Sequence, residues 1–522
     1  MKKILSIFLL SVLLMMVGCT VTTATPTNNT TKDSEQTTKE SETSKDTLKP
    51  TDSVTQLETP TNLSIEKGIV SFTSVEGAET YTLKIKQDGV LVINLTVENG
   101  ADISSVLEDG DYTASIQAKA GTIKSEFSSE IEFTMGVKII DITTLSKIEG
   151  ELLSSEHYVN MSGRHYYNEN ESRMYFYYTA SGFKVSFTGT KLEATLLATG
   201  YNKLNNEARI VVLVDGEVYP AGGTTIVLNK AMEATYTLVE GLAQGKHSVE
   251  VLKRSEAIDN TIAIKDLTTD GNFEEPLSDK EKKILVIGAS GSTGYGNLAK
   301  NTSVTKNTYN SDGLKAFAYL TSRMYDTEID EINASGWGVK WGWNSQSGSA
   351  NIPAAFYKTG ILSTQSIEKV NYDYAHEVYD LIIINLGMND FNAYLKNISD
   401  EAQFTAKTNE YMDAVKAFYN ALLNVYDCPI LILHTANGNT KAEGYYNERV
   451  AAEINEGLES PRIFPIIIPA NGSGTNMGAN SHANVQTHIW TVDKIAEWIT
   501  NNLGWTKVRD NLVFNPTRDQ VD

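Results

Sequence analysis

The stretch that decides the fold is Lys283–Gly296, which reads KILVIGASGSTGYG. After Lys283, residues 284–287 form a continuous apolar run, typical of a strand buried on both faces, and a turn of small residues follows. Two similar runs, 381–385 and 429–433, occur further along the chain. Stretches with the period of amphipathic helices lie between and after them, at 313–324, 405–425 and 485–501. This alternation predicts an α/β domain over residues 280–507, with a parallel sheet flanked by helices.

Polar or small residues follow these strands where ligands of parallel sheets bind, at the carboxyl ends. Ser290 follows the first strand, Gly336 follows a shorter apolar stretch, and Asn389 follows the strand 381–385. His482 precedes the last predicted helix. A serine hydroxyl, an imidazole and N–H donors for an oxyanion are the groups that acyl transfer needs. Each also has an ordinary structural explanation: a small-residue turn, a helix cap or a packed histidine.

Two all-β segments precede this domain. Residues 58–136 contain short strands with alternating polarity, and the segments 77–81 and 110–114 resemble those of the bacterial fibronectin type III module. Residues 137–272 contain longer strands without intervening helices, which predicts a two-sheet jelly roll. The chain is therefore expected to be multidomain, with a fibronectin III-like β-sandwich, a β jelly roll and the α/β domain in that order.

The amino terminus has the pattern of an export signal. Residues 1–18 carry two lysines followed by an apolar run that is short for a membrane-spanning helix, which predicts a signal peptide. Val17-Gly18-Cys19 resembles the lipobox of bacterial lipoproteins, so Cys19 is the expected site of lipidation. Residues 19–57, rich in Ser and Thr, predict a disordered linker. We therefore expect a cell membrane lipoprotein exposed on the extracellular side.

Composition excludes several classes of function. The chain has 522 residues, of which 41% are hydrophobic, so most of it can form folded cores. Its net charge of −21 and its lack of a basic cluster argue against nucleic-acid binding. Two cysteines are too few for a disulfide framework or a thiolate metal cage.

Serine, glycine, asparagine and histidine in this order resemble the SGNH (GDSL-type) hydrolases. The pairing with a jelly roll more closely resembles carbohydrate esterase family 2, over about residues 155–505. The resemblance rests on several short runs: 162–164, 181–183, 187–190, 214–216, 238–242 and 253–257 in the jelly roll, and 288–296, 335–338, 385–390 and 482–488 in the α/β domain.

The resemblance implies an acetylxylan esterase-like enzyme that removes acetyl groups from xylan- or mannan-type polysaccharides. Ser290 would be the nucleophile and His482 the general base. The backbone N–H groups of Ser290 and Gly336 and the side-chain amide of Asn389 would form the oxyanion hole. No metal or organic cofactor is implied. The expected partners are an acetylated poly- or oligosaccharide and, through the lipid anchor, the membrane.

The chain departs from the family at two acidic positions. Ala289 replaces the acid beside the nucleophile, and Asn480 replaces the acid two residues before the histidine. Family members can orient this histidine with a main-chain carbonyl instead, so we expect a working Ser–His dyad. The alternatives are a weak or inactive esterase retained as a glycan-binding lipoprotein, and an esterase for O-acetylated peptidoglycan. Ser292, on the same turn, is a fallback nucleophile.

Three tryptophans follow the predicted oxyanion glycine: Trp337, Trp341 and Trp343. Because sugars stack on aromatic faces, we expect these residues to form a substrate-binding wall. Packing of the loop against the jelly roll is the structural alternative. We expect His488 and Asp390 to be structural, and Arg164 and Arg254 to hold the jelly roll to the α/β domain.

Overall fold

The computed structural model describes residues 56–136, 140–203, 206–343, 351–435, 439–469 and 476–509. The predicted signal peptide, Cys19 and almost all of the predicted linker lie outside the described residues. Within these ranges, no helix combines the length and the apolar character that a membrane crossing requires.

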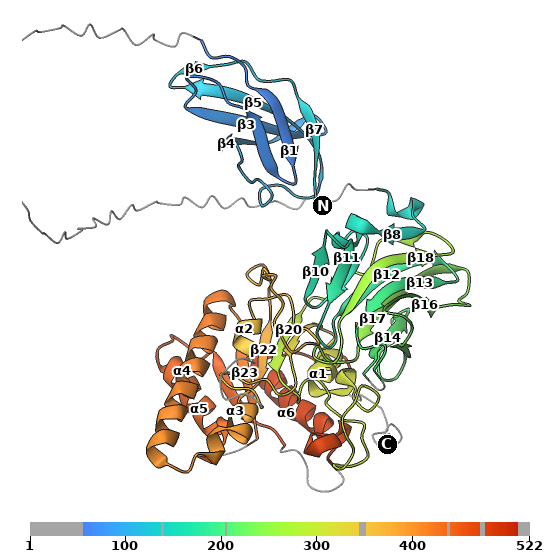
Figure 1. Ribbon diagram of the computed structural model, residues 1–522, viewed down its shortest axis with the longest axis vertical. Coiled ribbons are helices and arrows are strands. Elements are labelled where there is room, and N and C mark those ends of the chain that lie inside the picture. The colour runs from blue at the N-terminus through green and yellow to red at the C-terminus, as the bar shows by residue number, and fades with distance from the viewer. Residues whose placement is uncertain are drawn as a thin grey trace, which may run out of the picture. The chain divides into compact units, whose positions relative to one another are not determined.

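The first described segment is a small β module (Figure 1). Its strands are β1 (Thr61–Glu66), β2 (Ile69–Thr73), β3 (Thr80–Gln87), β4 (Val90–Val97), β5 (Gly110–Ala120), β6 (Ile123–Lys124) and β7 (Ile131–Met135). β1 pairs with β2, and the second sheet has the order β4-β3-β5-β6 with β7 also on β5. Alternate residues of both sheets, such as Val70 and Ile116, share one buried core. The two-sheet sandwich agrees with the sequence, whereas the fibronectin III resemblance stays a prediction.

The second segment is a pair of antiparallel sheets. One has the order β10-β11-β18-β13-β16 with β8 on β18, and the other β15-β14-β17-β12-β19 with β9 on β12. The strand bounds are β8 (Lys147–Glu149), β9 (Asn160–Ser162), β10 (His165–Asn168), β11 (Arg173–Phe176), β12 (Gly182–Gly189), β13 (Leu192–Ala198), β14 (Ala208–Val214), β15 (Thr224–Leu228), β16 (Glu233–Val239), β17 (Gly245–Lys253), β18 (Ile262–Thr269) and β19 (Phe273–Glu274). Apolar residues of both sheets, including Phe183 and Leu196, fill the space between them, as the predicted jelly roll requires.

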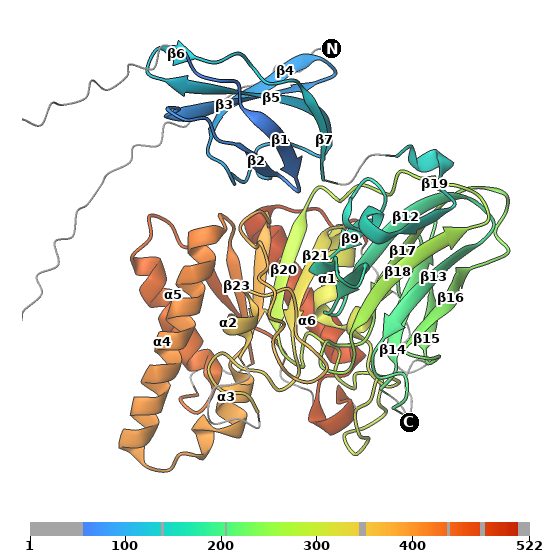
Figure 2. The same ribbon diagram turned by 45° about the horizontal axis from the view of Figure 1, so that its top comes forward.

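The third segment is a five-stranded parallel sheet of order β21-β20-β22-β23-β24. Its strands are β20 (Lys283–Gly288), β21 (Glu328–Asn333), β22 (Leu381–Asn385), β23 (Ile430–His434) and β24 (Ile463–Ile467). Its helices are α1 (Phe317–Tyr325), α2 (Ile352–Ala355), α3 (Met388–Ala393), α4 (Glu401–Val425), α5 (Glu443–Glu456) and α6 (Val485–Leu503). Figure 2 shows β20 beside β21, which is an edge strand of this sheet.

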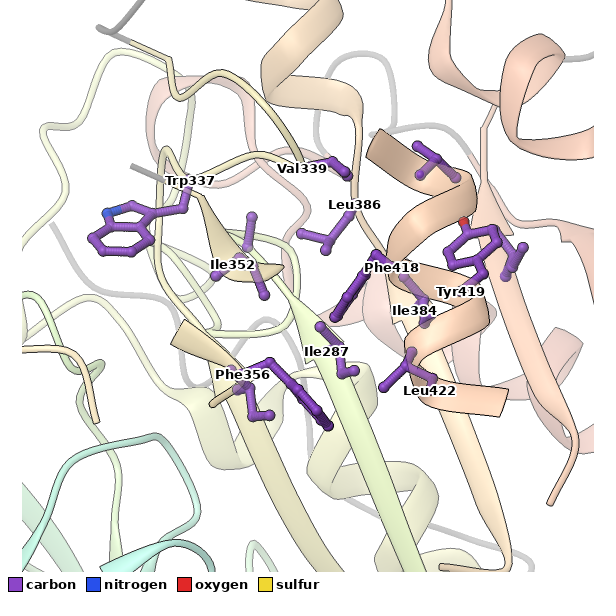
Figure 3. Close-up of a cluster of buried hydrophobic side chains, with 14 of the residues drawn as sticks. Ile287, Trp337, Val339, Ile352, Phe356, Ile384, Leu386, Phe418, Tyr419 and Leu422 are labelled. Atoms are coloured by element: carbon purple, nitrogen blue, oxygen red, sulfur yellow. The ribbon is translucent and has the colours of Figure 1, made fainter. Parts of the chain in front are cut away.

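The sheet buries both of its faces, and the strands β20, β22 and β23 are largely apolar, whereas the edge strand β21 (EIDEIN) also buries four polar residues. Leu285 and Ile287 of β20 point to one face, where they join a core with residues of α4 and α5 such as Phe418 (Figure 3). Ile284 and Val286 point to the other face and join a core with α1 and α6. This is the doubly covered parallel sheet that the apolar runs predict.

The jelly roll and the α/β domain are joined by buried polar contacts. Arg164, which is fully buried, donates from Nη1 to the main-chain oxygens of Phe356 at 2.6 Å and Lys358 at 3.0 Å. Arg254 donates from Nε to the Ser311 oxygen at 3.1 Å. These bonds agree with the interface role expected for both arginines.

Candidate active site

The predicted oxyanion and nucleophile residues come from three adjacent strands. Gly288, the last residue of β20, is paired with Asn333 of β21 on one side and Asn385 of β22 on the other. Ser290, Gly336 and Asn389 each follow these paired strand ends by two to four residues. The order β21-β20-β22 therefore brings all three to one edge of the sheet.

The imidazole of His482 meets the Ser290 hydroxyl at this edge. His482 Nε2 lies 2.9 Å from Ser290 Oγ, a normal hydrogen-bond distance, although the residues are 192 positions apart. Ser290 is partly exposed, so a substrate can approach its oxygen. A serine hydroxyl bonded to an imidazole is the arrangement of an activated nucleophile.

The other imidazole nitrogen faces a main-chain carbonyl. His482 Nδ1 lies 3.3 Å from the carbonyl oxygen of Asn480, which leaves Nε2 as the acceptor for the Ser290 proton when Nδ1 carries the hydrogen. Asn480 has φ +51°, a left-handed conformation that asparagine tolerates better than most residues. Burial lowers the pKa of His482 from its ordinary value, and the hydrogen bond to Asn480 partly opposes this.

Two of the three predicted oxyanion donors have free backbone N–H groups. Among the described residues, neither Ser290 N–H nor Gly336 N–H has a hydrogen-bond partner within the protein. Gly336 has φ +80°, a conformation that glycine adopts without strain. Asn389 Nδ2 donates one hydrogen bond to the Trp337 oxygen at 2.7 Å, which fixes the amide and leaves its second N–H for a ligand.

Tyr295 belongs to the site, although its position in the sequence indicates no role for it. Its ring stacks on the His482 ring with centroids 4.1 Å apart and an interplanar angle of 29°. The next residue, Gly296, packs so tightly on Ala479 that an added Cβ would lie 2.3 Å from the Ala479 Cβ. The glycine-rich spacing after Ser290 was the available signal, since it permits this close approach of the two loops.

The tryptophans divide into buried and exposed residues, which corrects the expected aromatic wall. Trp337 and Trp341 are 2% and 4% exposed and belong to the core beneath the loop, so their rings are not available for stacking. Trp343 is 51% exposed. Its N–H donates to the Gly336 oxygen at 2.6 Å, which places its backbone beside the predicted oxyanion glycine. Only Trp343 keeps the predicted sugar-stacking role.

Ser292 is in a position that excludes it as the fallback nucleophile. Its side chain is fully buried, and Oγ donates to the Ala289 oxygen at 3.0 Å. Ser292 is buried because the turn after β20 folds back onto Gly288. The approach is so close that a Cβ added to Gly288 would lie 2.4 Å from Ser292 Oγ. Ser290 is therefore the exposed serine of this turn.

His488 and Asp390 are both buried and structural. Phe317 N–H donates to His488 Nδ1 at 3.3 Å, and burial lowers the pKa of His488 to about 3. Asp390 accepts the N–H groups of residues 339, 340 and 341 at 2.8–2.9 Å. It thus braces the loop that carries the tryptophans, which agrees with the structural role expected for it.

Two family models match the chain. A family model described as the carbohydrate esterase 2 N-terminal domain matches residues 161–276, and one described as GDSL-like lipase/acylhydrolase matches residues 284–467. These matches correspond to the jelly roll and to most of the α/β domain.

Two curated relatives and one solved structure are similar to the chain. The cellulase/esterase CelE of Acetivibrio thermocellus is 24% identical over 63% of this chain, which spans only 38% of that protein. The acetylxylan esterase / glucomannan deacetylase of Cellvibrio japonicus is 26% identical over 60% of this chain and 81% of its own length. A family two carbohydrate esterase from Clostridium thermocellum, solved with cellohexaose, has 23% identity and a TM-score of 0.57. The match covers 67% of this chain and 100% of the solved chain, so the two proteins share the fold.

Proposed function

We propose that this chain is a carbohydrate esterase of family 2, a surface-anchored carboxylic ester hydrolase that removes O-acetyl groups from polysaccharide. The family matches and the esterase relatives support the class of enzyme. The observation that carries the proposal is the 2.9 Å contact between Ser290 Oγ and His482 Nε2, beside the unpartnered N–H groups of Ser290 and Gly336.

The reaction would proceed through an acetylated serine. Ser290 Oγ attacks the acetyl carbonyl carbon while His482 Nε2 takes the hydroxyl proton, and the carbonyl oxygen becomes an oxyanion bound by the three N–H donors. The intermediate collapses, the C–O bond to the sugar breaks, and His482 returns the proton to the sugar oxygen. Water then attacks the acetyl group with His482 as base, which releases acetate and restores Ser290. The residues of the site supply every proton transfer in this scheme.

The substrate class follows from the relatives and from the exposed ring at the site. One relative is named as acting on acetylxylan and glucomannan, and one similar structure was solved with cellohexaose. Trp343 offers an exposed aromatic face next to the Gly336 backbone, as recognition of a sugar ring requires. An acetylated xylan- or mannan-type chain is therefore the proposed partner.

The proposed anchor is the lipid on Cys19, and the sequence of residues 1–57 is its support. Cells that express the chain with a Cys19→Ala change should release the protein into soluble fractions, and the wild-type protein should incorporate an alkyne-labelled fatty acid and sediment with membranes. Incorporation of the label by both proteins would refute lipidation at this cysteine.

A weak or inactive glycan-binding lipoprotein is the second candidate. One observation favours it: within the described residues, no carboxylate forms a hydrogen bond or an ion pair with His482. A main-chain carbonyl stabilises an imidazolium less than a carboxylate does, so the rate of such a dyad can be low.

Acetate release from acetylated xylan distinguishes the two candidates. The wild-type protein should release acetate above the buffer rate, and Ser290→Ala should abolish the release. Ser292→Ala, which removes a buried hydroxyl two residues away, should retain activity as the matched control. Sugar binding that is unchanged by Ser290→Ala in a wild-type protein without turnover would establish the binding function instead.

A further inference from the structure

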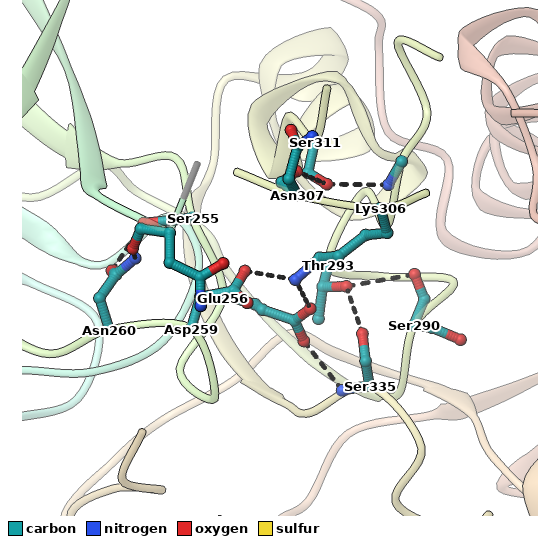
Figure 4. Close-up of polar contacts among 12 residues, drawn as sticks. Ser255, Glu256, Asp259, Asn260, Ser290, Thr293, Lys306, Asn307, Ser311 and Ser335 are labelled. Atoms are coloured by element: carbon teal, nitrogen blue, oxygen red, sulfur yellow. Dashed lines mark hydrogen bonds and ion pairs between the residues drawn. The ribbon is translucent and has the colours of Figure 1, made fainter. Parts of the chain in front are cut away.

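A loop of the jelly roll inserts two acidic residues beside the active site. Glu256 and Asp259 follow β17, and both contact Lys306 of the α/β domain (Figure 4). Lys306 Nζ lies 2.8 Å from Glu256 Oε1 and also pairs with the Asp259 carboxylate. The Glu256 side chain is only 2% exposed and that of Lys306 is 10% exposed, so this ion cluster is almost entirely removed from water.

The second oxygen of Glu256 reaches the oxyanion loop. Glu256 Oε2 accepts the N–H of Ser335 at 2.9 Å, and Ser335 directly precedes Gly336. The carboxylate therefore fixes the peptide next to the one that presents the Gly336 N–H. Asp259 has no such contact with the loop among the described residues.

The same loop is tied to the nucleophile turn. Ser335 Oγ lies 3.2 Å from Thr293 Oγ1. The Thr293 hydroxyl in turn donates to the Ser290 main-chain oxygen at 3.2 Å (Figure 4). Lys306 Nζ lies 5.4 Å from the centre of the Tyr295 ring, which stacks on His482. Glu256 thus contacts the oxyanion loop, and through Ser335 and Thr293 it is linked to the nucleophile turn, while Lys306 lies over the ring that stacks on the base.

We propose that Glu256 is a positioning residue for ester hydrolysis, a jelly-roll carboxylate that holds the Ser335–Gly336 backbone in the geometry of the oxyanion hole. The proposal rests on the function proposed above. It gives the jelly roll a part in the chemistry, since the α/β domain alone lacks this carboxylate. A displacement of about 1 Å at such a donor can reduce the rate about 10²-fold.

The charge state of the cluster suits this role. Burial opposes ionisation of Glu256, but the Lys306 ammonium and the Ser335 N–H bring its pKa below the ordinary value, so it stays a carboxylate. Burial raises the pKa of Asp259. The two acids share one lysine, yet only Glu256 contacts the oxyanion loop, which makes Asp259 a matched control.

The test compares Glu256→Ala, Glu256→Gln and Asp259→Asn in the full chain, with 4-nitrophenyl acetate as substrate. Glu256→Ala should lower kcat about 10²-fold with little change in KM, because the oxyanion contact forms in the transition state. Glu256→Gln keeps an oxygen that can accept the Ser335 N–H, so its kcat should be close to that of the wild type. Asp259→Asn should stay within about threefold of wild type. The melting temperature of each variant shows whether it is folded.

The pH profile gives a readout that loss of packing would not produce. Among the residues that the structure describes, Tyr295 and His488 contact or act on His482, as do the charged groups of Glu256 and Lys306. Burial lowers the pKa of His482 most, while Glu256 raises it and Lys306 lowers it. Glu256→Gln should therefore move the acidic limb of kcat/KM to lower pH, and Lys306→Met should move it to higher pH.

Labelling of Ser290 by diisopropyl fluorophosphate separates this proposal from the proposed function. If the wild-type protein is labelled but releases no acetate, the esterase function fails, while labelling rates of the variants still test Glu256. The positioning role would be overturned if Glu256→Ala and Asp259→Asn lowered kcat or the labelling rate equally. It would also be overturned if Glu256→Ala left both rates unchanged. A wild-type protein that is neither labelled nor active would overturn both proposals.

Discussion

The carbonyl oxygen of Asn480 lies 3.3 Å from His482 Nδ1, so the backbone takes the place of the acid that the resembled family carries at residue 480. The Asn480 side chain is exposed, and its main-chain conformation is left-handed. The turn geometry at this residue, rather than its amide group, therefore orients the imidazole.

Asn480→Gly should keep kcat/KM within about threefold of wild type, since glycine adopts φ +51° readily and retains the carbonyl. His482→Asn in the same assay should abolish turnover. A loss of tenfold or more in Asn480→Gly, measured with 4-nitrophenyl acetate in a variant of unchanged melting temperature, would show that the side chain takes part in catalysis.

The activity should rise with pH through the pKa of His482, because the neutral imidazole is the base. Burial lowers this pKa from 6.5, so the midpoint of the acidic limb of kcat/KM is expected below 6.5. The measurement is a pH profile at constant ionic strength. An acidic limb centred above 7 would contradict the buried, carbonyl-oriented imidazole.

Asn389→Ala should lower kcat about 10²–10³-fold, because it removes one oxyanion donor. Asn392→Ala is the matched control, since Asn392 lies on the same helix α3 and accepts a hydrogen bond from Lys396 at 3.0 Å. The control should retain wild-type kcat. Equal losses in both variants would assign the effect to α3 as a whole.

Trp343→Ala should affect substrate binding, whereas Trp337→Ala should affect the stability of the fold. Trp343 is exposed, so its loss should raise KM for an acetylated xylo-oligosaccharide at least several-fold, with little effect on 4-nitrophenyl acetate or on the melting temperature. Trp337 is buried, so its loss should destabilise the fold by about 3–5 kcal/mol. Denaturant unfolding and the two kinetic assays check both outcomes. An oligosaccharide KM that does not change in Trp343→Ala would remove the proposed sugar platform.

Much of the fold was predictable because it depends on local patterns. The continuous apolar runs of β20, β22 and β23 indicated a sheet buried on both faces. The residues that follow β20 and β22 indicated that Ser290 and Asn389 lie at one edge, and Gly336 after β21 joins them there. The periodicity also indicated α4 and α6, with ends within a few residues.

The remaining features depend on contacts between distant segments. The burial of Trp337 follows from its packing in the core, which no short-range pattern of the loop reveals. The stacking of Tyr295 on His482 and the contact of Glu256 with Ser335 each join residues that are far apart in the sequence. Such pairs are decided by tertiary packing rather than by local propensity.

The most direct test of the central claim is to trap the acetylated enzyme. Wild-type protein is acid-quenched during turnover of 4-nitrophenyl acetate, and its peptides are analysed by mass spectrometry. We predict an acetyl group on Ser290 that is absent from the Ser290→Ala protein. Turnover with the acetyl group on another residue, or with no acetylated peptide under conditions that trap a known serine esterase, would contradict the Ser290–His482 mechanism.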